Sequence, residues 1–398
     1  MTISYSGNFF YLLFRWRGSL WKAVYKEMLI FLIFYFALSL LYRFVLDDVD
    51  RGRFETVSKT FARYLEYIPL TFLLGFYVNA IVSRWWKQFE LVAWPEELMS
   101  LINFVIPGQE EEDVLKRHQI ARYFCLTCAL AWRDVSIKVR KRFPTMRSVL
   151  RSGLITDFEL QLYTSVQAET VRWALPLQWT EKIVRNQLTE GKIPPPLCNA
   201  VLAQINKYRE SFRRLYCYDW VCVPLVYTQV TALAVYGYFT FCLLGRQFLD
   251  VTKNIKDNDV DFYVPVFTML QFMFYVGWFK VGQELFRPFG TDDDDIELNY
   301  ILDRHVRSSF ALVHTAQAQQ PPPTKDHFWG QEVATLAHSK LSSRLHDHLP
   351  KQHAYVQLKN DDDDEMLEES QLPVPQANKL QPKLRGFAAR DPRKTRLF

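Results

Sequence analysis

The sequence predicts an all-α integral membrane protein with a large helical cytosolic part and a polar tail. Apolar residues make up 49% of the 398 positions, and they gather in a few long blocks. Few segments alternate between polar and apolar residues in the way that half-buried strands do. From about residue 316 the chain becomes polar, beginning with a proline-containing stretch. We therefore expect one helical domain over residues 1–315 and a tail over 316–398 without a packed core of its own.

Four blocks lack charged residues for long enough to be candidates for membrane insertion. A spanning helix needs about 20 largely apolar residues, and only the third block is comfortably that long. Flanking basic residues can carry their charges out to the interface, and the aromatic residues at the block ends are typical of an interfacial belt. The alternative, buried helices of a large soluble protein, is disfavoured by the length and aromatic content of the third block. The charge-free blocks are 28–42, 67–83, 220–245 and 262–279, and the expected membrane segments are about 28–46, 64–84, 220–246 and 262–280. The residues at the block ends are Lys26, Arg43, Arg84, Trp21, Tyr25, Trp85, Trp86 and Trp278.

The distribution of basic residues predicts the orientation. The N-terminal flank carries Arg15, Arg17, Lys22 and Lys26 against Glu27 alone, whereas the loop between the third and fourth blocks is acidic. The positive-inside rule then places both termini in the cytosol. The cytosolic part covers about 87–219 and 288–315. It is expected to be helical, because apolar residues recur at three-to-four spacing and prolines 194–196 are a sound helix entry.

Several classes of function are excluded by composition and motifs. A formal net charge of +5 that is scattered along the chain does not indicate nucleic-acid binding. The six cysteines do not form a secreted disulfide pattern, and the C-x-x-C at Cys125 and Cys128 lacks a second pair for zinc. No H-x-x-x-H pair, G-x-S-x-G motif or phosphate-binding glycine loop is present, so we do not expect an enzyme. The hydrophobic stretch at Phe9–Phe14 is too short for a signal peptide.

The second block would have two different faces as a helix. One face carries Ile68, Phe72, Gly75, Phe76, Asn79 and Ser83, and the other carries Leu70, Leu73, Leu74, Tyr77 and Ile81. The small and polar residues of the first face are compatible with helix–helix packing. They are equally compatible with a water-filled path that Ile68, Phe72 and Phe76 close by dewetting. The second interpretation requires a symmetric oligomer, because one helix cannot make a ring.

Four consecutive aspartates, 292–295, follow the fourth block. Thr291 is a plausible N-cap, which would place Asp292 and Asp295 on one side of a new helix. Such a run can be a cap with a solvated face. It can also supply the carboxylates that calcium prefers, together with free carbonyls of a Gly/Pro turn. It is not an EF-hand, because the sixth position from Asp292 is Glu297 instead of glycine. A second acidic run, 361–365, reads as a solvated charge block.

The motifs of the chain resemble those of the bestrophin family. They are WRGS at 16–19, IPLTFLLGFYV with RWW at 68–86, WPEELMSL at 94–101, YDW and PLVYTQV at 218–230, GRQFL at 245–249, and VPVFTMLQFMFYVGWFKV running into PFGTDDDDIE at 264–297. The similarity extends over about 16–313. It implies a calcium-activated chloride channel of the plasma membrane, a homopentamer with one central pore that passes chloride and other monovalent anions. The alternative is a membrane scaffold or regulatory subunit that binds other channels through its tail.

The resemblance also implies roles for individual residues. Ile68, Phe72 and Phe76 correspond to the family's hydrophobic neck, with Asn79 and Ser83 facing the pore, and a cytosolic constriction falls near Leu197. Asp292 and Asp295 correspond to side-chain calcium ligands, with Asp293 as a further candidate and the main-chain oxygens of Glu284 and Arg287 completing the set. Three departures bear on calcium control. Arg287 stands where the family has Asn, Thr291 stands where it has Glu, and the N-terminus is several residues shorter, which removes a carbonyl contributed from a neighbouring subunit.

Overall fold

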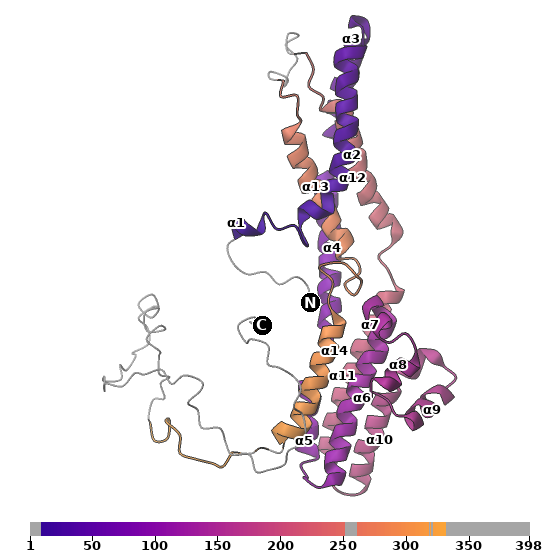
Figure 1. Ribbon diagram of the computed structural model, residues 1–398, viewed down its shortest axis with the longest axis vertical. Helices are drawn as coiled ribbons and strands as arrows, with labels where there is room; N and C mark the ends of the chain where they lie inside the picture. The colour runs from indigo at the N-terminus through magenta and orange to yellow at the C-terminus, as the bar shows by residue number, and fades with distance from the viewer. Residues whose placement is uncertain (1–8, 251–260, 318, 320, 332–398) are drawn as a thin grey trace. The chain divides into compact units, whose positions relative to one another are not determined.

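The computed structural model describes residues 9–250, 261–317, 319 and 321–331 (Figure 1). Within these ranges the chain forms helices and no strand, which confirms the predicted all-α class. The chain divides into two compact units, 1–321 and 322–398. The described part of the second unit, 322–331, is coil that ends in a turn. The acidic run 361–365 lies outside the described residues.

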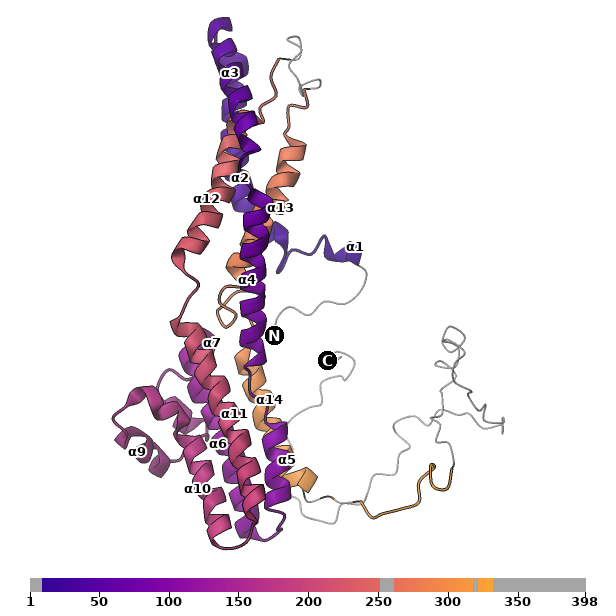
Figure 2. The ribbon, with the colours of Figure 1, turned by 180° about the vertical axis from the view of Figure 1, so that it is seen from behind.

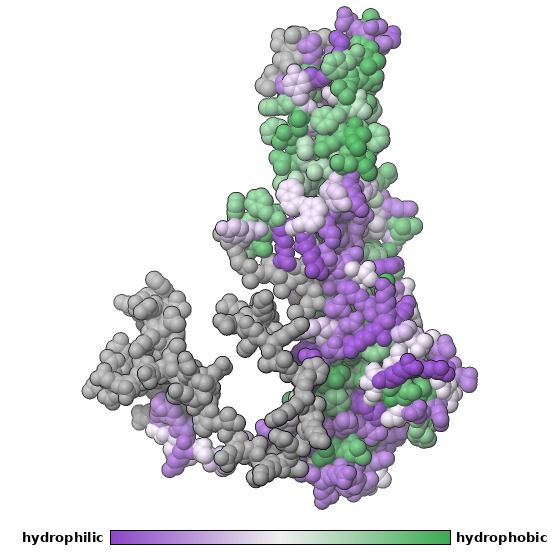
Figure 3. All heavy atoms as spheres, viewed as in Figure 1, coloured by the Kyte–Doolittle hydropathy of each residue, from purple (hydrophilic) through white to green (hydrophobic). Residues whose placement is uncertain are grey.

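Five long helices of the first unit form an apolar bundle. They lie side by side in both views of the ribbon (Figures 1 and 2), and their buried faces share one core that includes Tyr35, Leu74, Tyr77, Val235 and Phe279. Space-filling colours show a continuous apolar band over this bundle (Figure 3). The helices are α2 (Leu20–Leu40) with its π-helical extension η1 (Leu41–Val45), α3 (Asp48–Leu65), α4 (Leu70–Glu90), α12 (Leu225–Gly245) and α13 (Val266–Glu284).

Two of the described helices are long and apolar enough to cross a membrane. They are the 26-residue Leu20–Val45 and the 21-residue α12, and the bent pair α3 and α4 qualifies together as a third span. The fourth expected segment, 262–280, corresponds to α13, which is not among these candidates. It nevertheless packs along α2 and α4 inside the apolar bundle.

Two of the expected membrane segments are interrupted. The expected segment 64–84 contains a break, because α3 ends at Leu65 and α4 starts at Leu70 with a bend of 47° between them. The cause is Pro69, which has no N–H to donate and disfavours helical geometry in the residue before it. The segment 220–246 is likewise shortened, because Trp220 ends α11 and Pro224 precedes the start of α12.

The remaining helices form a second bundle around α6, which is called the polar bundle below. Residues 123–132 of α6 are buried without a break, because neighbouring helices contact it on several sides. Cys125 and Cys128 are fully buried there as free thiols. The helices are α5 (Glu96–Val105), α6 (Glu111–Val135), α7 (Ile137–Arg142), α8 (Met146–Arg151), α9 (Asp157–Ser165), η2 (Glu169–Ala174), α10 (Leu175–Thr189), α11 (Pro195–Trp220), α14 (Leu298–Phe310) and η4 (Ala311–Ala316); a short helix α1 (Phe9–Leu12) precedes α2.

A buried ion pair connects α6 to the start of α9. The Arg122 guanidinium donates to both carboxylate oxygens of Glu159 at 2.6 Å. The same carboxylate accepts from the hydroxyl of Tyr123 and from the N–H of Thr156, which caps α9. Although burial alone would raise it, the pKa of Glu159 is lowered to about 2 by these donors. The pair is therefore fully compensated despite its burial.

Candidate functional site

The helix α4 has one face covered by the apolar bundle and one face that no other described helix covers. Leu70, Leu74, Tyr77 and Ile81 are buried. Phe72 and Phe76 are 64% and 60% exposed, and their rings meet edge to face with centroids 4.7 Å apart. Asn79 and Ser83 continue this exposed face toward the C-terminal end of α4. The result is a strip of two phenyl rings followed by an amide and a hydroxyl.

Ile68 does not belong to that helical row. It lies in the break before Pro69, outside α4, and its side chain is half-buried against the core of the apolar bundle. The expectation of one helical face running through Ile68 is wrong for this reason. Phe72 and Phe76 are the two apolar side chains of the expected row that the described chain leaves exposed.

The four aspartates lie in a loop between α13 and α14, and do not start a helix. The expectation that Thr291 caps a helix with Asp292 and Asp295 on one side is wrong, because α14 begins only at Leu298. Turn hydrogen bonds hold the loop instead. The N–H of Asp295 donates to the carbonyl of Asp292 at 3.4 Å, and the N–H of Ile296 donates to the carbonyl of Pro288 at 2.7 Å.

Asp295 is the buried carboxylate of this acidic loop, only 3% exposed. One of its oxygens, Oδ2, accepts the N–H of Asp292 at 2.6 Å. The same oxygen would lie 2.9 Å from a Cβ on Gly290, and the carbonyl oxygen of Arg287 would lie 3.4 Å from it. The absence of a side chain at Gly290 thus leaves room in which a carboxylate and a carbonyl oxygen converge.

The acidic loop carries negative charge that the described chain balances only in part. Burial, with a smaller contribution from Asp292, raises the pKa of Asp295 to about 6. Burial also raises the pKa of Asp294, with Asp293 adding to it. The pKa of Glu284, at the end of α13, is raised by burial and by Asp294 and Asp292. Carboxyl groups with raised pKa values are groups whose ionised form a nearby cation would stabilise.

These residues fit a hard divalent cation. The Asp295 carboxylate stands beside the Arg287 carbonyl at Gly290, and the backbone N–H of Asp292 donates to that carboxylate. The carbonyl of Glu284 has no helical partner four residues on, because Pro288 lacks an N–H. In the described ranges no group of three or more His, Cys, Asp or Glu side chains is placed to hold a metal. A cation here would therefore depend on main-chain oxygens as well as carboxylates, which is a coordination that calcium accepts.

Asp293 has a different environment from its neighbours. Its carboxylate forms an ion pair with Lys22 on the first turn of α2, and Arg17 lies 3.6 Å away. The hydrogen bond from Lys22 lowers the pKa of Asp293. Sequence reasoning missed this pairing, although the basic N-terminal flank and the acidic run offered complementary charges. It connects two segments 271 positions apart.

Leu197 is not brought near either of these groups of residues. It lies in the first turn of α11 and packs, half-buried, against the core of the polar bundle. Its N–H donates to the carbonyl of Pro194 at 3.1 Å.

Fold and site together define a helical membrane protein with an exposed phenylalanine face and an acidic loop after its last apolar helix. The family described as "Bestrophin, RFP-TM, chloride channel" matches residues 1–315. The chain is 47% identical over 388 residues to Bestrophin homolog 13 of Caenorhabditis elegans, covering 90% of this chain and 93% of that protein. It is 42% identical to human Bestrophin-3, covering 84% of this chain and 51% of that protein. The chain belongs to the bestrophin family, a family of chloride channels.

Solved structures agree with the fold. A bacterial bestrophin homolog from Klebsiella pneumoniae carrying the mutation I180T superimposes with a TM-score of 0.54 at 16% identity, covering 73% of this chain and 98% of that one. A second structure of that homolog gives a TM-score of 0.53 at 16% identity, covering 74% and 98%. At this identity the likeness supports the helical architecture alone.

Proposed function

We propose that the chain is a calcium-activated anion channel of the plasma membrane, with chloride as a permeant ion and with both termini cytosolic. The observation that carries this proposal is the exposed strip on α4. A single chain leaves Phe72 and Phe76 exposed on one helix of its apolar bundle. Five copies around one axis would bring five such strips together, and no single chain could enclose a path with one.

The neck is proposed to close by dewetting. Rings made by Phe72 and Phe76, with Ile68 at the entrance, offer an ion nothing that replaces its water, and removing that water costs several kcal/mol. Asn79 and Ser83 would follow as polar lining, and Leu197 would form a second narrow point along the cytosolic path. Helix N-termini and main-chain amides would favour anions over cations.

The acidic loop is proposed to control the neck. The carboxylates of Asp292 and Asp295 and the carbonyls of Glu284 and Arg287 would hold calcium, whose charge offsets their mutual repulsion. Glu284 ends α13, and the α13 residues Gly282 and Phe279 pack against Tyr77 on the buried face of α4. A loop fixed in one arrangement can therefore bias the position of α4, provided that calcium binds the open arrangement more tightly. Asp293 is assigned to the Lys22 ion pair.

Flux from vesicles tests this function. The purified full chain is reconstituted into lipid vesicles loaded with chloride, and anion efflux is followed with and without calcium. We expect efflux that calcium increases and that gluconate in place of chloride reduces. A scaffold or regulatory subunit would give no efflux in either condition. Efflux that is the same with and without calcium would show that the acidic loop does not control the channel.

A further inference from the structure

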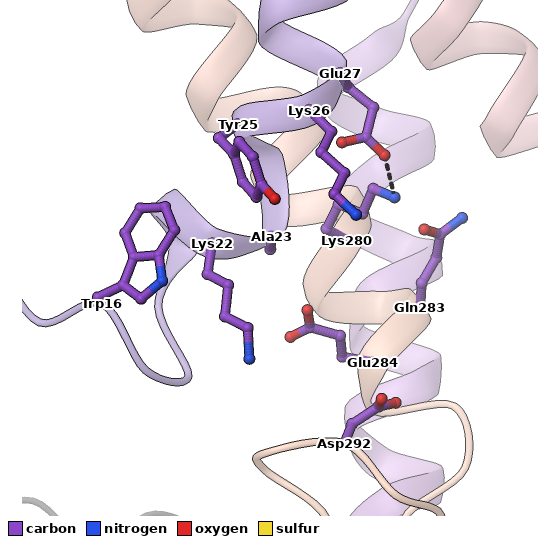
Figure 4. Close-up of a pocket in the computed structure, with 10 residues that line it drawn as sticks. All are labelled: Trp16, Lys22, Ala23, Tyr25, Lys26, Glu27, Lys280, Gln283, Glu284 and Asp292. Atoms are coloured by element: carbon purple, nitrogen blue, oxygen red, sulfur yellow. Dashed lines mark ion pairs between the residues drawn. The ribbon is translucent and has the colours of Figure 1, made fainter.

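A cavity of about 550 Å³ opens between the start of α2 and the end of α13 (Figure 4). The two helices approach closely beside it, because Gly277 lacks the Cβ that would clash with Leu20. The cavity has cationic, aromatic and acidic walls, and its acidic wall belongs to the site described above. Its lining residues are Trp16, Lys22, Ala23, Tyr25, Lys26, Glu27, Lys280, Gln283, Glu284 and Asp292.

The three lysines of this cavity are not equivalent. Lys280 is paired with Glu27 at 2.5 Å, and Lys22 is paired with Asp293. Lys26 has no carboxylate within ion-pair distance in the part of the chain that the structure describes, and its ammonium group lies 5.9 Å from the centre of the Tyr25 ring. Lys26 is therefore the cation that remains available to an anionic ligand.

An apolar stripe on α2 continues directly from Lys26. Leu29, Ile30 and Ile33 follow it at positions three, four and seven along the helix, which places all four side chains on one face. The three apolar side chains are exposed. A cation at one end of an exposed aliphatic stripe matches a ligand with an anionic head and hydrocarbon tails.

The surroundings of the cavity match the boundary of a membrane. The apolar band ends at this level and a strongly polar surface begins (Figure 3). Trp16 and Tyr25 stand together at the rim with ring centroids 5.6 Å apart. The exposed aromatic segment around α1 is held here, because the indole N–H of Trp21 donates to the carbonyl of Leu13 at 2.6 Å. Trp and Tyr beside basic residues are typical of the headgroup region.

We propose that this cavity binds an anionic glycerophospholipid. Its phosphate would pair with the ammonium of Lys26 beside Trp16 and Tyr25, and its acyl chains would lie along Leu29, Ile30 and Ile33. The aliphatic stripe favours a lipid over a free phosphate, because a free phosphate has no hydrocarbon chain to pack against Leu29, Ile30 and Ile33. The proposal rests on the membrane position of α2. It requires neither bound calcium nor anion conduction, although Glu284 and Asp292 line this cavity and also belong to the proposed calcium site.

Binding of a fluorescent phosphatidylserine to the purified full chain in detergent tests the proposal. We expect Lys26→Gln to weaken binding about fivefold, the effect of one lysine near an anionic surface. Lys26→Arg should restore it, because the charge returns. The matched control is Lys59→Gln, which removes an exposed lysine on α3 far from the cavity in the sequence and outside its lining. Gel-filtration and melting profiles in phosphatidylcholine show whether each variant is folded.

Four results would overturn the proposal. They are unchanged binding by Lys26→Gln, an equal loss in Lys59→Gln, displacement of the labelled lipid by glycerol 3-phosphate, and no binding to the assembled protein. The third would identify a free phosphate as the ligand, and the fourth would mean that a second copy covers the cavity. None of these measurements involves ion flux, so they stand apart from the test of channel function.

Discussion

The rings of Phe72 and Phe76 meet edge to face, 4.7 Å apart, on a face of α4 that the described chain leaves uncovered. Replacing both with alanine should lower the barrier to ions without disturbing the buried face of the helix. We expect basal, calcium-free anion current to rise on the order of tenfold, which corresponds to about 1.4 kcal/mol of barrier. Patch-clamp recording from cells that express the variant measures this current.

The control for that experiment is Leu233→Ala. Leu233 is an exposed aliphatic residue on α12, another helix of the apolar bundle. Its variant should keep the basal current of the parent chain. If the double alanine variant opens and closes like the parent, Phe72 and Phe76 do not form the neck.

Asp295→Asn should weaken calcium binding on the order of tenfold or more, because a buried carboxylate ligand loses its charge. Isothermal titration calorimetry of the purified chain measures the affinity. Asp303→Asn is a suitable control, since Asp303 lies on α14 and pairs with Arg142 away from the loop. Equal calcium affinities for the parent and Asp295→Asn would exclude this carboxylate as a ligand.

Gly290→Ala tests the same site without removing a ligand. The added Cβ would lie 2.9 Å from Oδ2 of Asp295, so the carboxylate or the turn has to move. We expect calcium affinity to fall on the order of tenfold, the usual effect of disturbing the support of a metal ligand. Gly52→Ala, where a Cβ meets nothing within 4 Å, should bind calcium as the parent does. An unaffected Gly290→Ala would mean that calcium is held elsewhere.

Glu159→Ala should destabilise the polar bundle by about 3 kcal/mol, because the largely buried guanidinium of Arg122 loses its carboxylate partner and keeps only the carbonyl of Leu154. Thermal unfolding followed by circular dichroism measures the loss. Glu210→Ala breaks an exposed pair with Arg214 on α11 and should have little effect. Similar melting temperatures for the two variants would show that the Arg122 pair does not stabilise the fold.

Stability should fall as pH is lowered through the range set by His305. This residue of α14 is fully buried among Trp94, Phe124 and Trp132, and burial lowers its pKa from 6.5 to about 4. Between these values the unfolded chain binds a proton that the folded chain does not. The free energy of unfolding therefore decreases from pH 6.5 toward pH 4, by roughly 3 kcal/mol in total.

Melting temperatures over this pH range check the effect of His305. His305→Gln should lose that share of the pH dependence, whereas His327→Gln, at an exposed histidine, should keep it. Parallel pH curves for the parent and His305→Gln would contradict the assignment. Glutamine retains a donor for the carbonyl of Ala93, which accepts from His305 when that nitrogen carries its hydrogen.

The sequence was sufficient to predict the helical class and the two faces of α4, because both follow from local periodicity. Pro69 is a local signal for the break before α4. A hydropathy window averages over a single proline, so the break was not predicted. The acidic loop was harder. Thr291 has the chemistry of a cap, yet tertiary turns that use Pro288 and Ile296 delay the helix to Leu298. The preference of Thr291 for a cap position is therefore outweighed by the hydrogen bonds of the turn.

Long-range pairs could not be read from local patterns. The ion pair of Lys22 with Asp293 depends on α2 and α13 lying side by side, which no spacing within either segment encodes. The room at Gly290 depends in the same way on where Asp295 folds back. What the sequence offered was charge complementarity between the two ends of the domain, without a distance.

The narrow contact of Leu20 with Gly277 gives the beginning of α2 a mechanical role. Lys22, two residues after Leu20 on the same helical turn, forms the ion pair with Asp293 of the acidic loop. The first turn of α2 is therefore in contact with both α13 and the loop that follows it. A side chain at position 277 would collide with Leu20, so a substitution there would separate α2 from α13 and disturb the Lys22–Asp293 ion pair as well.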